Sequence, residues 1–466
     1  MHALDPTPRA GHLSVEDLKT AVNSGDITTV LLAVPNMLGQ LKGKRLGALD
    51  FLETIKDEAK GGAEGGAEMC AYVLATDVDM EALDGFELTG WEQGFGDVHI
   101  VPDLATIRRL PYMPGTVLIH ADALHHSGLP VDVAPRTMLR TQLGRLKDLG
   151  LDVAVGLESE FMLYRGTAQQ AHAAGYSALE PMAPHNLDYA LDHPVALTDF
   201  FDDLEEVLRD AGTPVEAVKT EGAAGQVEVT FPYGEALAAC DAYTVYKHAV
   251  KHLGGRHTMT PTFMASPRID LSSGLHLHLS LWRDGRNAVA IPDEGDLSDT
   301  MQEAIAGLLF GLPHLTPLFA PNVNSYKRFR PHSFAPTHFT WGRDNRGCAI
   351  RVTGHGDGAH LEIRLAGADA NPYLALAASL AAIHHGLTER PEFPPETTGD
   401  AYQTDDGLPV RADLVEALAD FRSSKLALGA FGPTVVRHYA YAARHEIRWH
   451  RHRVTDAERE RGFLRA

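Results

Sequence analysis

Hydrophobic and polar residues alternate over short distances in the first 120 residues of the chain. Ser14 and Asp17 form a capping-box pattern ahead of an apolar stripe at helical spacing, which predicts a helix that ends near Gly25. Short apolar runs bounded by turn residues then predict strands around a Gly-rich break at 61–68. The clearest of these strands are 28–34 and 69–78. This part of the chain has the pattern of a small, sheet-rich domain.

Longer helical and strand patterns follow. A helical stretch at 135–150 leads into an alternating strand at 151–164, and helices interleave with strands as far as about Ile363. After Asn371 the apolar spacing is helical. It predicts helices at 371–387, at 413–429 and from Val435 onward. The Pro-rich, acidic segment 391–410 is expected to form an irregular surface loop.

The change in pattern places a domain boundary near 122–135. We therefore expect an α+β fold with an N-terminal domain over 14–122 and a C-terminal domain over 130–466. The length of 466 residues allows about three domains or fewer. The 44% of hydrophobic residues is enough for a large core.

The net charge narrows the range of partners. Lys and Arg number 41 against 62 Asp and Glu, which gives −21 at pH 7, and this excess repels phosphate backbones and anionic headgroups. Nucleic-acid and membrane partners are therefore not expected. The chain has no run of about 18 apolar residues, its first residues do not resemble a signal peptide, and its three cysteines show no CxxC spacing. We expect a cytoplasmic protein.

Two glutamates share one face of the predicted strand at 151–164. Glu158 and Glu160 are two residues apart, and the period of two in a strand points both carboxylates the same way. Two like charges on a buried face are costly unless a cation or a proton lies between them. The pair therefore indicates a metal site or an acid pair. The alternative is an exposed sheet face, where water solvates both carboxylates.

Two further segments repeat this arrangement of charged residues. Glu221 stands at the end of one predicted strand, and Glu228 lies two residues into the next. For this segment alone, an ordinary surface turn is the simpler explanation. Glu362 and Arg364 also alternate along a strand, where the alternative is a salt-bridged strand face.

A third segment alternates His276, His278 and Ser280 with leucines, so that one face is polar and the other apolar. One barrel-like cavity that holds cations is the simplest explanation for all of these strands. Its candidate ligands are carboxylates with a single imidazole, which favours Mg²⁺ or Mn²⁺ over zinc. They are Glu158, Glu160, Glu221, Glu228, His276 and Glu362.

Basic residues near these segments suggest the chemistry. Divalent ions beside arginines favour phosphoryl transfer, because such ions neutralise the charge on phosphate oxygens. Residues 322–328, Arg346 and Arg351 supply the basic groups. In a strongly acidic chain we interpret them as anion-binding rather than as solvated surface.

Taken in order, these motifs resemble the glutamine synthetase family. ESEF (158–161) resembles the family's paired-glutamate strand, and EGAAGQVEV (221–229) resembles its Gly-Gln-x-Glu signature. SGLHLHLSLW (273–282) resembles the Ser-Gly-x-His-x-His-x-Ser motif. NSYKR (324–328) is similar to the family's substrate loop, and LEIRLAGADANPYL (361–374) to its C-terminal block. The match runs from about residue 14 to the end of the chain. It implies a β-grasp-like N-terminal domain and a catalytic domain with a curved antiparallel sheet surrounded by helices.

The resemblance also implies two to three Mg²⁺ or Mn²⁺ ions per site, with ATP as co-substrate. The ion near the amino-acid substrate would be held by Glu160, Glu221 and Glu228. The ion that bridges the ATP phosphates would be held by Glu158, His276 and Glu362.

Other residues take roles in substrate binding through the same resemblance. Arg328 and Arg364 would bind L-glutamate, and Tyr189 is a further candidate there. The transferring phosphate would be bound by Arg346 and Arg351, and the nucleotide by His278, Ser280 and Arg346.

Asp84 resembles the residue that a neighbouring subunit lends to each active site. This implies a ring assembly, and we expect a homododecamer of two stacked hexamers. Asp84 is also the residue we expect to take the proton from the amine, with Glu87 and Glu221 as the alternatives.

The flap of the site departs from the glutamine-forming enzymes. Their flap has the form Pro-Gly-Tyr-Glu-Ala-Pro, whereas residues 331–336 read Pro-His-Ser-Phe-Ala-Pro. Phe334 replaces the glutamate, and an apolar ring can line a path for a carbon chain but cannot accept a proton. The glutamate-binding Asn-Gly pair is altered to Leu271-Ser272. The flap change indicates an amine other than ammonium, whereas the change at 271–272 concerns recognition of the α-amino end of glutamate.

We expect the amine to be a polyamine, namely putrescine, spermidine or spermine, because Glu87, Glu92 and the net charge favour a second ammonium group. Ethanolamine or another monoamine is the first alternative, followed by ordinary glutamine synthesis and by an inactive regulatory relative. A metal-dependent amidohydrolase also uses His-x-His, but that motif normally opens the first barrel strand of such folds, and here it lies beyond mid-chain.

Overall fold

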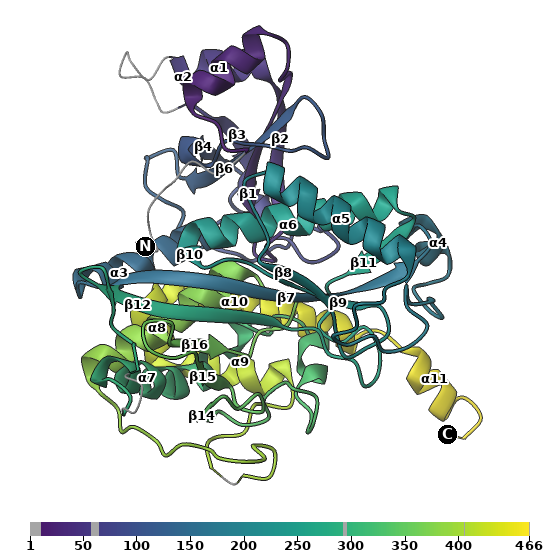
Figure 1. The fold of residues 1–466 in the computed structure, drawn as a ribbon. Helices are drawn as coiled ribbons and strands as arrows, with labels where there is room; N and C mark the ends of the chain where they lie inside the picture. Colours follow the sequence, from purple (N-terminus) through teal and green to yellow (C-terminus); the bar gives the residue numbers. More distant parts are fainter. Residues whose placement is uncertain (1–10, 57–64, 292–295, 405, 466) are drawn as a thin grey trace.

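The computed structural model describes the chain except for residues 1–10, 57–64, 292–295, 405 and 466. Within the described residues, the named strands form two sheets, one of six strands and one of ten. Figure 1 shows the smaller sheet with α1 and α2 at one end of the molecule, and the larger sheet among the remaining helices. None of the helices in this part of the chain combines the length and apolar character that crossing a bilayer requires.

The smaller sheet contains the N-terminal strands in the order β2-β1-β6-β4-β3, with β5 beside β6. Strand β1 runs parallel to β6 and antiparallel to β2. The elements of this region are α1 (Val15–Asn23), β1 (Thr29–Pro35), β2 (Leu41–Gly47), α2 (Ala48–Lys56), β3 (Ala67–Cys70), β4 (Asp97–Pro102), β5 (Arg108–Arg109) and β6 (Thr116–Leu124), with short 3₁₀ turns at η2 (Ala71–Leu74) and η3 (Leu104–Thr106).

The larger sheet has the order β14-β15-β16-β12-β7-β9-β8, with β10 and β11 beside β7 and β13 beside β12. Its pairs are antiparallel except for β14 with β15. The strands are β7 (Asp152–Arg165), β8 (Ala217–Thr220), β9 (Gln226–Thr230), β10 (Gly234–Glu235), β11 (Met259–Thr262), β12 (Leu275–Arg283), β13 (Arg286–Asn287), β14 (Trp341–Arg343), β15 (Ile350–Thr353) and β16 (His360–Ile363).

Helices surround this curved sheet, as the sequence predicted. Figure 1 shows α5 and α6 along one side of β7 and β12, with α7, α8 and α9 on the other, and α11 projecting at the C-terminal end. The helices are α3 (Pro135–Asp148), α4 (Ala168–Ala173), α5 (Val195–Asp210), α6 (Ala236–Arg256), α7 (Asp299–Leu315), α8 (Pro372–Glu389), α9 (Leu414–Ser423), α10 (Lys425–Arg451) and α11 (Asp456–Gly462), with 3₁₀ turns at η4 (Thr316–Leu318) and η5 (Asn324–Arg328).

Most of the predicted elements are confirmed. The capping box of α1 is present, with the Ser14 hydroxyl accepting from the backbone N–H of Asp17. Helix α3, strand β7 and helix α8 lie where the periodicity predicted them. The described residues of 391–410 contain no helix or strand. Residues 61–64 of the predicted Gly-rich break lie outside the described part of the chain.

Two predicted elements were wrong. The expected strand at 69–78 continues only to Cys70, and the chain then makes the 3₁₀ turn η2, which buries Ala71, Val73 and Leu74 in the core. A short apolar run is compatible with either conformation, because both bury it. The expected helix at 413–429 is two helices, since Ser424 ends α9 and caps α10 by accepting from the N–H of Ala427.

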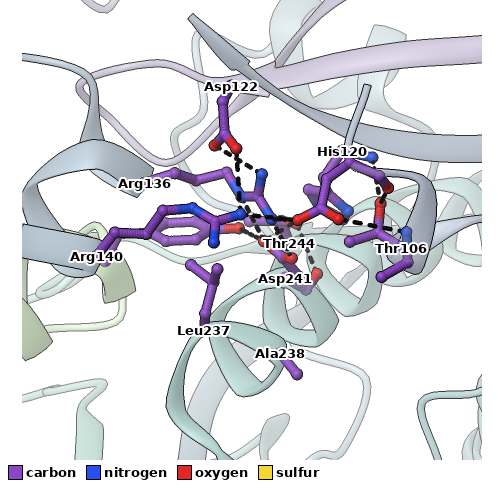
Figure 2. Close-up of polar contacts among 12 residues, drawn as sticks. Thr106, His120, Asp122, Arg136, Arg140, Leu237, Ala238, Asp241 and Thr244 are labelled. Carbon is purple, nitrogen blue, oxygen red and sulfur yellow. Dashed lines mark hydrogen bonds and ion pairs between the residues drawn. The ribbon is translucent and has the colours of Figure 1, made fainter. Parts of the chain in front are cut away.

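A buried ion-pair network connects the smaller sheet to helices that pack on the larger sheet (Figure 2). The Arg136 guanidinium on α3 donates to Asp122 on β6 at 2.8 Å and to Asp241 on α6 at 2.9 Å. Tyr373 on α8 donates to Asp241 at 2.5 Å. Although burial alone would raise it, the charges of His120 and Arg136 lower the pKa of Asp241 to about 2. The network holds β6, α3, α6 and α8 in a fixed arrangement.

Candidate active site

A cavity of about 360 Å³ opens on the polar face of the larger sheet. All six predicted metal ligands line it, together with most of the residues predicted to bind substrate. The latter are Tyr189, Arg328, Phe334, Arg346, Arg351 and Arg364. Residues from distant parts of the sequence therefore meet in one cavity, as the sequence predicted. Their individual roles stay predictions.

The alternation of β12 explains how this cavity is built. Leu275, Leu277 and Leu279 are fully buried on the apolar face of the strand. His276 and His278 point to the opposite face because side chains alternate along a strand. The sheet register sets His276 opposite Glu158 on β7. Sequence alternation and register together bring the imidazole to the carboxylate.

Glu158, Glu160 and His276 form the first group able to hold a metal ion. One ligand atom from each lies within 4.8 Å of the others. The distance from His276 Nδ1 to Glu158 Oε1 is 2.6 Å. Glu160 accepts from Gln226 Nε2 at 2.8 Å and from the N–H of Gly274 at 2.9 Å. These bonds orient the Glu160 carboxylate toward the cavity.

Gly274 approaches this group closely. A Cβ built there would lie 2.9 Å from His276 Nε2, 3.1 Å from an Arg328 nitrogen and 3.3 Å from Glu160 Oε1. A side chain at this position would therefore press against a candidate ligand and against the guanidinium of Arg328. The glycine of the Ser-Gly-x-His motif lets these side chains approach the backbone without displacement.

Glu221 and Glu228 lie on the other side of the cavity and share a lysine that the sequence analysis did not identify. Lys219 Nζ contacts the Glu221 carboxylate and lies 3.4 Å from Glu228 Oε1. It also lies 4.5 Å from the centre of the Tyr189 ring. Burial, the charge of Glu158 and the neighbouring Glu221 raise the pKa of Glu228. Lys219 offsets part of the negative charge of this side.

The sequence contained a signal for Lys219. Lys219 lies on β8, two residues before Glu221, and it is directly opposite Glu228 in the β8–β9 register. A strand period of two therefore puts Lys219 on the same face as the two glutamates. The contact of Lys219 with Glu228 depends on the β8–β9 register, which the sequence of one strand does not reveal, so the lysine was missed.

Glu362 joins the candidate metal ligands to the arginines. Arg351 donates to its carboxylate at 2.9 Å, and Arg364 contacts the other oxygen. Although burial alone would raise it, the charges of Arg364 and His276 lower the pKa of Glu362 to about 2. Glu158, His278 and Glu362 form a second group whose ligand atoms lie within 4.8 Å of one another.

Arg328 is fully buried beneath the cavity. It donates through Nε to Ser272 Oγ at 3.1 Å and through one terminal nitrogen to the carbonyl of Leu365 at 3.0 Å. The altered pair Leu271-Ser272 thus contacts the arginine predicted to bind glutamate. The Ser272 hydroxyl fixes the position of the guanidinium.

A second cavity, of about 390 Å³, adjoins the first and contains the predicted nucleotide-binding residues His278 and Ser280. Arg351 lines both cavities. Aromatic rings of Tyr233 and Trp282 line the second cavity, and the sequence analysis did not single them out. Trp282 is two residues beyond Ser280 on β12, so the same alternation could have identified it.

Asp84 and Glu87 do not line the 360 Å³ cavity of their own chain. The backbone carbonyl of Asp84 accepts from the Tyr441 hydroxyl, and its carboxylate accepts from the N–H of Trp91 at 3.2 Å. Glu87 forms an ion pair with Arg437, with one N–O distance of 2.9 Å. Both residues therefore belong to a loop packed against α10, away from the other predicted site residues.

The donor set fits a hard divalent ion. Five carboxylates and one imidazole are oxygen-rich ligation, which suits Mg²⁺ or Mn²⁺. The carboxylates point to one cavity with a partial balance of charge from Lys219 and the arginines. A cation is the remaining element that would relieve their mutual repulsion.

Comparison with known proteins agrees with this geometry. Residues 132–462 match the family described as the glutamine synthetase catalytic domain. The chain is 43% identical to a gamma-glutamylethanolamide synthetase of Streptomyces coelicolor, over 99% of this chain and 98% of that protein. It is 33% identical to a gamma-glutamylputrescine synthetase of Escherichia coli, over 77% of each chain. The chain belongs to the glutamine synthetase family.

Other relatives support the same assignment. A glutamate–isopropylamine ligase of a Pseudomonas species is 32% identical over 92% of this chain and 93% of that protein. A solved structure of a GmaS–ADP complex superposes with a TM-score of 0.80 at 26% identity, over 96% of this chain and 99% of the other. The mixed fold with its curved sheet is thus the fold of this family, as predicted.

Proposed function

We propose that this chain joins the γ-carboxylate of L-glutamate to the nitrogen of a small monoamine, with ethanolamine as the first candidate. As a member of its family the chain is an ATP-dependent ligase. The glutamate carboxylate oxygen would attack the γ-phosphorus of ATP and release ADP. The amine would then attack the carbonyl carbon of the acyl phosphate and release phosphate.

Phe334 is the observation that carries this proposal. Its side chain lines the cavity with Glu221 and Tyr189, at the flap position where glutamine-forming enzymes have glutamate. A phenyl ring offers no proton acceptor and no charge to a bare ammonium ion, but it can pack against the carbon chain of an amine. The name of the Streptomyces coelicolor relative points to the same class of substrate.

The charges around Glu87 and Lys219 favour a monoamine over a polyamine. The expectation of a polyamine rested on Glu87, Glu92 and the net charge, and the Glu87 carboxylate is already paired with Arg437. Lys219 adds a positive charge beside Glu221 and Tyr189, which opposes a second ammonium group at that side. Putrescine remains the second candidate, because the Asp188 side chain lines the cavity and the Escherichia coli relative is named for that amine.

The chain's own residues would perform the positioning. Arg328 and Arg364 would bind the carboxylates of glutamate, and Arg346 and Arg351 the phosphate, because guanidinium groups match planar and tetrahedral oxyanions. Divalent ions held by the six ligands would supply charge neutralisation of the phosphate oxygens. The amine must lose a proton before it attacks, and Glu221 and Asp84 are the candidate acceptors.

Phosphate release from ATP and glutamate tests the proposal when it is measured with ethanolamine, putrescine, spermidine, spermine and ammonium. We expect the highest kcat/KM with ethanolamine, and Phe334→Glu should lower it about tenfold or more while raising ammonium use, since one lost apolar contact of this size corresponds to about 1–3 kcal/mol. Phe310→Glu, an exposed change on α7, is the control and should leave both values unchanged.

An amine profile that Phe334→Glu does not alter would show that the flap does not select the substrate. A wild-type enzyme that prefers putrescine would move the assignment to the second candidate. Phosphate release with ammonium alone would make the chain a glutamine synthetase.

A further inference from the structure

The flap that carries Phe334 has an unusual backbone. His332 and Phe334 both have a φ of 59°, in the left-handed region that non-glycine residues rarely adopt. The flap form of the glutamine-forming enzymes has glycine at the position of His332. Two such residues within three positions are costly and persist only where the surroundings hold them. The flap must therefore be fixed by contacts from outside it.

Contacts from the cavity side hold the middle of the flap. The Ser333 hydroxyl lies within hydrogen-bond distance of the carbonyls of Arg328 and Arg330, at 2.8 Å and 2.7 Å, and its one hydrogen is donated to either of them. Arg364 donates to the carbonyl of Phe334 at 3.3 Å. These bonds connect the flap to the arginines of the site.

The segment Asp400–Tyr402 also holds the flap. The Tyr402 hydroxyl donates to the carbonyl of Ala335 at 3.2 Å. The His332 ring meets the Tyr402 ring edge-on with centres 5.2 Å apart, and His332 Nε2 lies 3.5 Å from Asp400 Oδ2. Asp400 in turn accepts from the N–H of Tyr402 at 3.0 Å. The two residues with left-handed backbone are therefore bracketed by one short segment.

The same segment is anchored to the loop between β14 and β15. Asn345 donates to the carbonyl of Gly399 at 2.9 Å. Gly347 lies against Tyr402, since a Cβ there would come within 3.4 Å of the ring. Arg346, which lines the cavity, stands between these two residues. The segment thus connects the flap to the wall of the site that carries Arg346.

We propose that Tyr402, with Asp400 and His332, is a latch that positions the flap so that the Phe334 ring lines the amine end of the cavity. The inference rests on the proposed function, because it makes these three positioning residues determinants of amine binding. Without the latch the flap relaxes from its left-handed conformation, and the Phe334 ring leaves the cavity wall. The contacts of Tyr402 and His332 act on the flap itself, so the loss falls mainly on the amine and less on ATP and glutamate.

Tyr402→Phe is the sharpest test, because it removes the hydroxyl and keeps the ring. Loss of one hydrogen bond should speed hydrogen exchange in flap residues 331–336 by about two- to tenfold. It should raise KM for the amine by a similar factor. KM for ATP should rise less than KM for the amine, and kcat at saturating amine should stay the same. His332→Gly should have the same effects, because it frees the backbone and removes the ring contact.

Tyr176→Phe is the matched control, since Tyr176 is exposed and remote from the flap in sequence. It should change neither flap exchange nor any KM. The latch is refuted if Tyr402→Phe leaves flap exchange and amine KM at wild-type values, or if it raises KM for ATP and amine alike. A wild type that uses no amine would refute the proposed function alone, because hydrogen exchange in the flap still reports on the latch.

Discussion

Lys219 shows how one side chain can balance the charge of the candidate metal site. Glu228 is 7% exposed and lies in the cavity with Glu158, Glu160 and Glu221. Four carboxylates in one cavity repel one another strongly where water is scarce. Among the described residues, Lys219 is the lysine that contacts two of these carboxylates, Glu221 and Glu228. We infer that it stabilises the fold when no divalent ion is bound.

Lys219→Gln should therefore destabilise the metal-free protein. Removing one partner of a buried pair costs several kcal/mol, and partial exposure of this pair reduces the expected loss to about 1–3 kcal/mol. Chemical unfolding with a chelator and with excess Mg²⁺ measures it, and the loss should shrink when Mg²⁺ binds the carboxylates. Lys147→Gln, which removes an exposed pair with Asp152, should cost about 0.5 kcal/mol or less in both conditions. Equal losses for Lys219→Gln with and without Mg²⁺ would contradict this role.

At the scale of elements, strand alternation carried most of the sequence prediction. Polar residues at every second position of β7 and β12 identified ligands that the register brings together. Register itself cannot be deduced from one strand, so the contact of Lys219 with Glu228 was missed. Short apolar runs such as 71–74 are compatible with more than one conformation, and there tertiary burial decided. The boundary between α9 and α10 was also not predicted, because a single serine, Ser424, ends one helix and caps the next.

Helix α10 is bent at a residue that the sequence could have flagged. Gly432 has φ 78° and ψ 162°, and Pro433 follows it. This backbone conformation is available almost only to glycine. Beyond the bend, Arg437 and Tyr441 contact the loop that carries Asp84 and Glu87. The bend therefore sets the direction of the helical segment that supports this loop.

Gly432→Ala should lower the free energy of unfolding by about 1–3 kcal/mol, the cost of forcing a non-glycine residue into this region. A Cβ at Gly432 would meet no atom within 4 Å, so the loss would come from the backbone alone. Gly429→Ala is the matched control, because this glycine lies in the same helix with equally open surroundings. There alanine should raise the free energy of unfolding, by at most about 1 kcal/mol. Denaturant unfolding of both variants measures the difference, and equal values would contradict the backbone argument.

At the scale of the whole molecule, the position of Asp84 is the feature that one chain leaves unexplained. The family resemblance predicts that Asp84 acts in catalysis, yet it lies on the loop against α10 and does not line the cavity of its own chain. A residue that acts at a cavity it does not reach must belong to the cavity of another copy. A heterologous contact of this kind closes into a ring when it repeats around an axis. The homododecamer therefore stays a prediction that the site itself motivates.

Mixing two inactive variants tests this arrangement. Asp84→Asn and Glu160→Gln should each lose most activity with glutamate, ATP and amine. Co-assembled in equal amounts, they should regain about a quarter of wild-type activity, because a random heterologous ring then joins an intact Glu160 cavity to an intact Asp84 loop at about one site in four. The double variant mixed with wild type controls for dilution, and its activity should follow the fraction of sites with both residues intact. Activity that stays at the level of the separate variants, with co-assembly verified by mass spectrometry, would place Asp84 outside the shared site.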